Sequence, residues 1–240
     1  MKPFSFTGKL YLIPTTLGES EITDVLPATI SRAIDFIFDF IVENEKTARK
    51  FIKQVNPDKK QADLRLHLLN KRTEPADLDA MIQPMLDGRN VGLMSEAGCP
   101  GVADPGAAIV KLAHENGIQV IPLVGPSSIL LALMASGMNG QQFAFNGYLP
   151  IDKSDKKAAL RQFEKISSEK DQSQIFIETP YRNNKLVEDL LVMLQPDTRL
   201  CIAADITLPS EYIRTLKVSQ WKKEKVDLQN RPAIFILHRP

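Results

Sequence analysis

Short apolar runs alternate with segments of helical periodicity through the first half of the chain. The apolar runs that predict strands lie at residues 9–13, 35–42, 64–69, 91–94 and 118–123. Apolar residues at helical spacing predict helices over 44–56, 78–87, 105–116 and 127–136, with Asp104 as N-cap of the third helix. This alternation favours an α/β fold with a largely parallel sheet.

The second half of the chain has a different pattern. A mixed-charge helix over about 154–168 is followed by a strand over 174–178 and a helix over 181–194. Three more apolar runs, at 200–203, 212–216 and 233–237, follow one another with less helix between them, which predicts a mixed sheet. We therefore expect two α/β domains, residues 1–122 and 123–240, with a boundary near 122–126.

Composition changes this picture little, but it excludes several classes of protein. The 240 residues carry 30 Lys and Arg against 29 Asp and Glu, and 43% of them are hydrophobic, which is the balance of an ordinary globular protein. No apolar run approaches the ~20 residues that span a bilayer, and residues 1–5 lack the apolar core of a signal peptide. Cys99 and Cys201 form no CxxC motif, so we expect a reducing, cytoplasmic location and no membrane partner.

Three loops at predicted strand ends are rich in small and hydroxylated residues. They cover residues 13–18, 95–106 and 125–128, and each is expected at the carboxyl end of a strand. In open α/β sheets ligands bind there, and small residues let a ligand approach the backbone. The loops match neither GxGxxG nor GxxxxGK[ST], so the two common nucleotide-binding fingerprints are absent. Tight turns and helix capping remain the alternative interpretation of each loop.

The usual catalytic side chains give weaker signals. His67, His114 and His238 have no metal-ligand spacing, and Cys99 has no recognisable base, so we expect neither a metal site nor a thiol nucleophile. Residues 46–60 contain six cations opposed by one carboxylate, Asp58. That cluster is either a solvated helix face or a surface that contacts phosphates.

Taken together, these segments resemble the tetrapyrrole (class III) S-adenosylmethionine-dependent methyltransferases. The most similar branch modifies a ribose 2′-hydroxyl of bacterial small-subunit ribosomal RNA and reads TPxGN, AEDTR, SDAGTPxxxDPG, PGP, FYES, ARELTK and KGE. The matching segments here are 15–19, 42–46, 95–106, 124–126, 176–179, 203–208 and 230–232. The similarity covers nearly the whole chain in order.

The resemblance implies two α/β domains with S-adenosylmethionine between them, usually in a homodimer. It implies the following cofactor-binding residues: Thr16, Ser95, Ala97, Gly98, Val102, Ser127, Ser128, Glu178, Asp205 and Ala233. Glu43 matches the acidic residue of AEDTR and is the candidate catalytic carboxylate on the substrate side, since a hydroxyl acceptor must lose a proton. Its alternative role is that of a carboxylate between a strand end and a helix start.

Several cationic positions of the branch differ in this chain. Lys46 replaces an arginine, Ala204 and Leu208 replace an arginine and a lysine, and KGE becomes residues 230–232, Asn-Arg-Pro. Because RNA binding requires cations near phosphates, three hypotheses stay open. The chain is a methyltransferase of small-subunit ribosomal RNA, a methyltransferase of another substrate such as a tetrapyrrole or a different RNA, or a cofactor-binding paralogue without activity.

Overall fold

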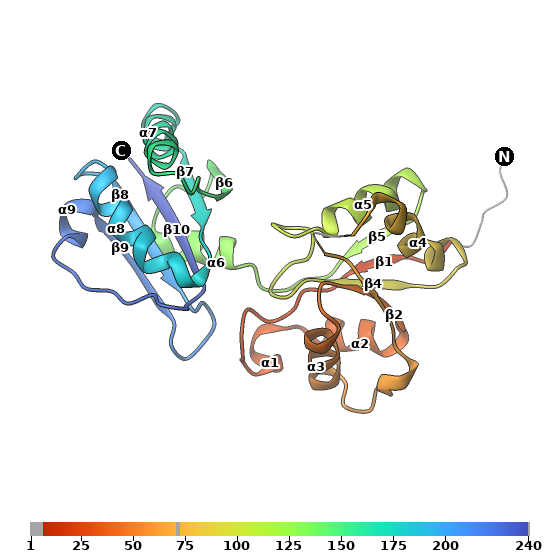
Figure 1. Ribbon diagram of the computed structural model, residues 1–240. Coiled ribbons are helices and arrows are strands. Elements are labelled where there is room, and N and C mark those ends of the chain that lie inside the picture. Colours follow the sequence, from red (N-terminus) through yellow and green to blue (C-terminus); the bar gives the residue numbers. More distant parts are fainter. Residues whose placement is uncertain (1–6, 71–72, 240) are drawn as a thin grey trace. The chain divides into compact units, whose positions relative to one another are not determined.

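Two α/β units account for the computed structural model, which describes residues 7–70 and 73–239 (Figure 1). The first unit comprises residues up to Ser127 and the second begins at Ser128. Each unit is built around its own five-stranded sheet. The predicted fold class is confirmed: the first sheet is parallel and the second is mixed.

The parallel sheet of the first unit has the strand order β3-β2-β4-β1-β5. Its strands are β1 (Leu10–Leu12), β2 (Asp39–Val42), β3 (Arg65–Leu68), β4 (Val91–Met94) and β5 (Val120–Pro122). The helices of this unit are α1 (Ile22–Val25), α2 (Ala28–Phe36), α3 (Glu45–Val55), α4 (Pro75–Leu86) and α5 (Gly106–Glu115), with a 3-10 turn, η1, at Gln61–Asp63. Since all five strands are parallel, their carboxyl ends lie at one edge of the sheet.

Helices cover both faces of this sheet, so its strands are apolar on both sides. Phe40 packs with α2 and α3, whereas its neighbour Ile41 packs with α4 and α5 on the opposite face. Gly92 in β4 is required by this packing, because a Cβ there would come within 2.8 Å of side-chain carbons of Phe40 and Ile13.

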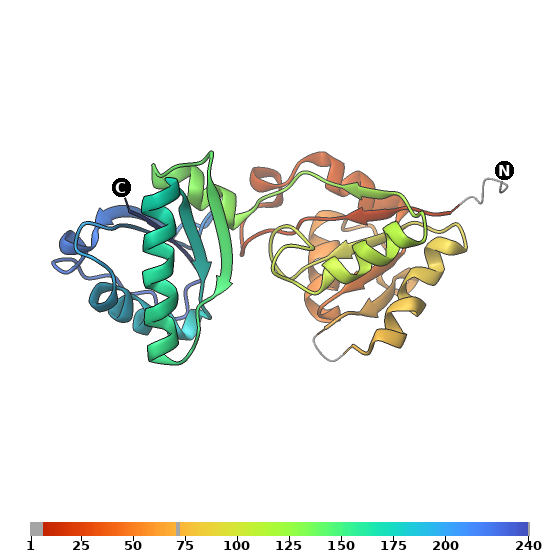
Figure 2. The same ribbon diagram turned by 90° about the horizontal axis from the view of Figure 1, so that it is seen from above.

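The mixed sheet of the second unit has the order β6-β7-β10-β8-β9, in which only β6 and β7 are parallel. Its strands are β6 (Phe143–Tyr148), β7 (Ser173–Ile177), β8 (Arg199–Ala204), β9 (Tyr212–Lys217) and β10 (Ala233–His238). The helices are α6 (Ser128–Ser136), α7 (Lys153–Lys170), α8 (Asn183–Met193) and α9 (Val218–Trp221), with a 3-10 turn, η2, at Pro180–Arg182. Figure 2 shows the length of α7 against the sheet.

A stack of aromatic rings forms the centre of this second core. The Phe176 and Phe235 rings lie on adjacent strands, nearly parallel, with centroids 5.9 Å apart. The fully buried Trp221 donates its indole N–H to the Leu200 carbonyl at 2.8 Å, which satisfies the only polar group of that side chain.

Three sequence predictions need correction. The run 35–42 is not one strand, because Asp35 and Phe36 end helix α2 and β2 begins only at Asp39. The helix predicted over 181–194 is divided into η2 and α8. Asp104 is not the N-cap residue of α5, which is Pro105. Asp104 precedes that N-cap residue, and its carboxylate accepts the N–H of Gly106, the first residue of the helix.

An ion cluster joins three strands at the amino edge of the parallel sheet. The buried Asp39 accepts two hydrogen bonds from Arg65, at 2.8 and 2.6 Å, and Arg89 lies 3.6 Å away. Burial favours a raised pKa for Asp39, but the hydrogen bonds and positive charge of Arg65, with that of Arg89, outweigh it and lower the pKa. The bidentate geometry is the strong form of such a pair.

We predict that Asp39→Asn lowers the free energy of unfolding by about 2 kcal/mol at pH 7, because it leaves two arginines without their carboxylate; half-exposed partners keep the loss below that of a fully buried pair. A lowered pKa stabilises the fold above the unfolded-state value of about 4 and ceases to do so as pH falls through the folded-state value. Urea unfolding should therefore show the difference from wild type shrinking below about pH 4. Asp87→Asn, which removes an exposed partner of Arg89, is the control, and equal stability of Asp39→Asn and wild type at pH 7 would contradict the prediction.

Candidate functional site

The three loops singled out in the sequence meet at the carboxyl edge of the parallel sheet. The Thr15 N–H donates to the Gly98 carbonyl at 3.0 Å, and the Thr15 hydroxyl donates to the Ser95 carbonyl. On the other side of loop 95–106, the Cys99 thiol donates to the Pro126 carbonyl, with Sγ and O 3.4 Å apart. The loop after β4 is therefore hydrogen-bonded to the loops after β1 and β5, in each case to or from a main-chain carbonyl.

Loop 95–106 is also held by its own polar side chains. The Ser95 hydroxyl lies within hydrogen-bond distance of the Ala97 and Gly98 carbonyls. The Asp104 carboxylate accepts the N–H groups of Gly101 and Gly106, although burial raises its pKa against the effect of those bonds. Burial also raises the pKa of the Cys99 thiol, which disfavours the reactive thiolate.

Glycine is required where these loops approach most closely. Gly98 has φ +75°, and a Cβ there would lie 3.1 Å from a Leu17 methyl and 3.3 Å from the Pro126 oxygen. A Cβ on Gly125 would lie 2.2 Å from the Pro14 Cβ. The edge of the sheet therefore presents backbone rather than side chains, as a ligand that contacts main-chain groups requires.

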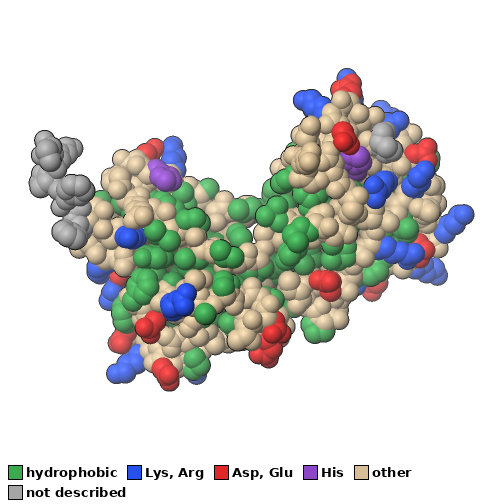
Figure 3. Space-filling view, turned by 180° about the vertical axis from the view of Figure 1, so that it is seen from behind, with side chains coloured by type: hydrophobic (Ala, Val, Ile, Leu, Met, Phe, Trp, Pro, Cys, Tyr) green, Lys and Arg blue, Asp and Glu red, His purple; other side chains and the backbone are tan. Residues whose placement is uncertain are grey.

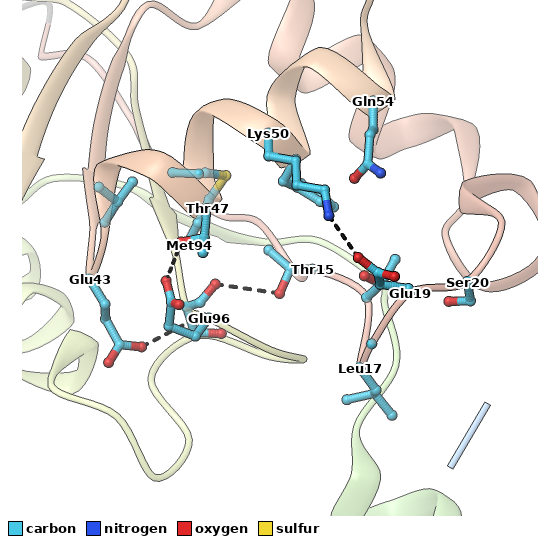
Figure 4. Close-up of a pocket in the computed structure, with 16 residues that line it drawn as sticks. Thr15, Leu17, Glu19, Ser20, Glu43, Thr47, Lys50, Gln54, Met94 and Glu96 are labelled. Carbon is cyan, nitrogen blue, oxygen red and sulfur yellow. Dashed lines mark hydrogen bonds and ion pairs between the residues drawn. The ribbon is translucent and has the colours of Figure 1, made fainter. Parts of the chain in front are cut away.

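A pocket of about 230 Å³ lies beside this junction, between the loop after β1 and helix α3 (Figure 4). Its wall is formed by Thr15, Thr16, Leu17, Gly18, Glu19, Ser20, Val42, Glu43, Thr47, Ala48, Lys50, Phe51, Gln54, Met94, Ser95 and Glu96. Three carboxylates are among them, and Glu43 is one.

Hydrogen bonds fix these carboxylates in place. Glu43 accepts the Glu96 N–H at 3.2 Å, and the Thr47 hydroxyl donates to the Glu96 carboxylate at 2.6 Å. Across the pocket Lys50 donates to Glu19 at 2.8 Å, and this bond lowers the pKa of the exposed Glu19 carboxyl. The pocket wall is thus rich in hydrogen-bond acceptors, which suits a ligand whose hydroxyl or amino groups donate hydrogen bonds.

In the second unit, antiparallel pairing brings three predicted residues to one edge. Strand β10 starts at Ala233, which pairs with Ala204, and its next residue pairs with Ile177. Glu178 and Asp205 directly follow those partners. The predicted residues Glu178, Asp205 and Ala233 therefore lie together at the end of three adjacent strands.

Each of these two carboxylates is held by an arginine. One oxygen of Glu178 accepts from Arg182 at 2.7 Å and from the Thr179 N–H, and one oxygen of Asp205 accepts from Arg231 at 2.7 Å and from Ser210. Among the described residues, the second oxygen of each carboxylate has no hydrogen-bond partner. Both carboxylates are nearly buried, so each is fixed in position with one acceptor atom left for a ligand.

Backbone strain is concentrated in the same segments. Asp205, Thr207 and Asn230 have positive φ values of 50°, 72° and 58°, and Ala103 in loop 95–106 has 62°. Residues other than glycine adopt this region at a cost, and such residues cluster at ligand sites.

The remaining predicted residues have different surroundings. Thr16 lines the pocket and is half-buried, whereas Ala97 and Val102 are exposed on the surface of loop 95–106. Ser127 ends the first unit and Ser128 is the first residue of α6.

Several side chains of the candidate site were not predicted from the sequence. Thr47, Glu96 and Lys50 were not assigned to it, and neither were the two arginines that hold Glu178 and Asp205. Arg182 follows Glu178 by four residues, a spacing that indicates an ion pair. The Arg231–Asp205 pair joins residues 26 apart, and no local pattern indicates it.

The residues that the structure describes contain no group of three or more His, Cys, Asp or Glu side chains placed to bind a metal ion. No helix among them has the length and apolar character needed to cross a membrane.

Comparison with known proteins gives consistent results. The family model described as "Tetrapyrrole (Corrin/Porphyrin) Methylases" matches residues 10–221. Proteins named "Ribosomal RNA small subunit methyltransferase I" are similar to the chain. The protein from Vibrio cholerae serotype O1 is 28% identical, over 95% of this chain and 76% of its own length. The protein from Buchnera aphidicola subsp. Schizaphis graminum is 30% identical, over 99% of this chain and 80% of its own length.

Solved structures share the fold at lower identity. The methyltransferase CobJ has a TM-score of 0.65 at 17% identity and covers 97% of this chain and 95% of its own. Uroporphyrin-III C-methyltransferase from Thermus thermophilus, complexed with S-adenosylhomocysteine, has a TM-score of 0.59 at 15% identity and covers 96% and 97%. At this level of identity the likeness shows that the chain shares their fold.

Proposed function

Because the chain belongs to the tetrapyrrole (corrin/porphyrin) methylase family, we propose that it is an S-adenosylmethionine-dependent methyltransferase of small-subunit ribosomal RNA, acting on a ribose 2′-hydroxyl. The observation that carries this proposal is the similarity, along nearly the whole chain, to relatives named as small-subunit ribosomal RNA methyltransferases. The ribose 2′-hydroxyl is the acceptor that the sequence resemblance implies. The structure adds a pocket at the strand ends where an α/β protein of this kind binds its ligands.

The described residues fit S-adenosylmethionine. Tightly packed glycine loops in the first unit offer backbone to a flat nucleoside, and Glu178 and Asp205 in the second unit each keep one acceptor oxygen for hydroxyl or amino groups. The Thermus relative supports this assignment, since its structure holds the demethylated product of the same cofactor. The proposed cofactor residues are those named from the sequence.

The protein's own contribution is to orient the acceptor and to remove a proton. The cofactor supplies a methyl group that is already activated by its sulfonium. Alignment of the attacking oxygen can supply several kcal/mol of catalysis. We assign proton acceptance to Glu43, because it lies on the wall of the pocket and its orientation is fixed by the Glu96 N–H.

The relatives do not favour the two alternatives. The solved structures named for a tetrapyrrole substrate are 15 to 20% identical to the chain. Three relatives at 26 to 30% identity are named for small-subunit ribosomal RNA. A paralogue without activity would need no oriented carboxylate in the pocket.

The proposal includes assembly as a homodimer in the cytoplasm. Leu130 and Met134 lie four residues apart on α6 and are 50% and 79% exposed, which is unusual for large apolar side chains on one helix face. Apolar side chains are visible on the surface of each unit in Figure 3. Both cysteines are free thiols, as expected in a reducing compartment.

We predict that the wild type binds S-adenosylmethionine with micromolar affinity and that Gly98→Leu weakens this binding at least about tenfold while the circular dichroism stays unchanged. The new side chain would enter the space between Leu17 and Pro126, whereas Gly101, also at positive φ, faces open space. Gly101→Leu therefore controls for backbone strain. Calorimetric titration measures both. Unchanged affinity in Gly98→Leu would exclude this loop from the site, and no binding by the wild type would contradict the proposed function.

Glu43→Gln should reduce the rate of methyl transfer to undermethylated small ribosomal subunits by about 10²-fold or more, with the cofactor Kd unchanged. Glutamine keeps an acceptor for the Glu96 N–H but cannot take the proton. Glu45→Gln, two residues along and exposed, is the matched control and should transfer at the wild-type rate. If Glu43→Gln is as fast as wild type, Glu43 has only its structural role.

Light scattering should find a dimer for the wild type and a monomer for Met134→Glu, because a buried carboxylate would be desolvated at an apolar interface. Val192→Glu changes an equally exposed residue on α8 and should stay dimeric. A monomeric wild type, or a dimeric Met134→Glu, would refute the assignment of α6 to the interface.

A further inference from the structure

Helix α3 has three distinct faces. Ala48, Phe51 and Ile52 are buried in the core of the first unit. Lys46, Lys50 and Lys53 are spaced at i, i+4 and i+7, so they form a stripe along the outer surface of the helix. The third face lines the pocket, and Lys50 stands at the border between that face and the stripe (Figure 4).

Half of the six cations in residues 46–60 already have partners within the protein. Arg49 donates to the Gln61 carbonyl at 2.7 Å, and Lys50 is paired with Glu19. Lys59 is buried, donates to the Asp35 carbonyl and lies over the Phe38 ring, and burial lowers its pKa. These three cations serve the fold of this segment.

The other half, Lys46, Lys53 and Lys60, is exposed. Their ammonium groups make no hydrogen bond or ion pair with any residue that the structure describes. Lysines whose charge stabilises nothing within the chain are the ones available to a polyanion.

The exposed lysines follow one another along the chain from the side of Glu43. Helix α3 begins directly after Glu43, at the carboxyl edge of the sheet, and leads away from it. Lys46 is at the end of the helix nearer Glu43, Lys53 lies about 10 Å further along the helix axis, and Lys60 follows after the helix. From Lys46 to Lys53 the cations therefore extend away from Glu43.

The concentration of charge points to the same conclusion. Residues 46–60 have a net charge of +5, whereas the whole chain has +1, so the remainder of the chain is acidic. Glu19 is exposed on the pocket wall opposite α3, and the exposed Glu21 and Asp24 follow it in the sequence. A polyanion that reaches the pocket is repelled there and attracted along α3.

We infer that Lys46, Lys53 and Lys60 form a phosphate track that holds the RNA strand on one side of the acceptor nucleotide. The inference rests on the proposed function. Lysine acts at such contacts as a point charge, so the track contributes affinity and register but no base recognition. The similar branch has cations where this chain has Ala204 and Leu208. The track would supply contacts to the RNA phosphates that those two neutral residues cannot make.

The test measures how binding of a short single-stranded RNA depends on salt. Each phosphate contact contributes about 0.7 to the slope of log K against log salt for a single strand. Replacing all three lysines by alanine, a good helix former, should reduce the slope by about 2 and the affinity at about 0.1 M KCl at least tenfold. The Kd for S-adenosylmethionine should not change.

The control variant removes the same charge elsewhere. Lys157, Lys222 and Lys223 are exposed in the second unit and make no side-chain bond with a described residue. Their triple alanine variant should keep the wild-type slope, apart from the small effect of net charge. Equal reductions in both variants would mean that only net charge matters, and an unchanged slope in the α3 variant would mean no contact there. Either result overturns the inference.

These readouts are separate from those that test the proposed function. If the wild type binds no S-adenosylmethionine and transfers no methyl group, the proposed function fails whatever the salt slope is. If the wild type transfers the methyl group and the α3 variant keeps its slope, the enzyme stands and the track is wrong. As a further check, Lys50→Ala breaks an existing ion pair and should change the slope less than Lys53→Ala does.

Discussion

The main-chain hydrogen bond from Thr15 to Gly98 is the constraint around which the first unit's site is organised. It joins the loop after β1 to the loop after β4, and Gly98 in turn fits against Pro126 in the loop after β5. Because neighbouring strands deliver these loops to one edge, each loop packs against the backbone of another. This close packing requires small residues in the loops, and it holds Gly98 at a positive φ. A side chain at that point would separate the loops and also occupy the surface that a ligand needs.

The second unit fixes its edge by charge instead of by close packing. Arg182 holds Glu178 from the next turn of the chain, while Arg231 holds Asp205 from a distant segment and also donates to the Ser210 carbonyl. Arg231 stands in the segment where the chain departs from the pattern of the similar branch. A cation is therefore present at this edge although Ala204 and Leu208 are neutral. Arg231 is paired with the Asp205 carboxylate at 2.7 Å, so its charge serves the scaffold of this edge.

Much of this arrangement could be predicted from the sequence, since strand and helix periods are local. The central strands β1 and β4 and the capped helix α3 lie where their patterns indicate. The run 35–42 was wrongly predicted as one strand because Phe36 and Phe38 are apolar although they are exposed. They make the apolar pattern continuous from the end of α2 to the start of β2. Strand β6 was missed because it is an edge strand with only partial burial and a glycine near its end. The loops that meet at the sheet edge were singled out from their small residues, but the Thr47–Glu96 and Arg231–Asp205 contacts depend on topology and have no local signal.

Helix α3 links recognition to chemistry because it is one rigid body with three roles. Its buried face is anchored in the core, its flank forms a wall of the pocket, and its first turn is capped by Asn44, the residue next to Glu43. The Asn44 side chain accepts the Lys46 N–H, so the proposed proton acceptor and the first lysine of the track are joined through a single cap. A strand held along α3 would be positioned relative to Glu43 without any flexible connection. For a reaction in which the protein chiefly aligns an oxygen with a methyl group, that stiffness is worth more than an additional catalytic side chain.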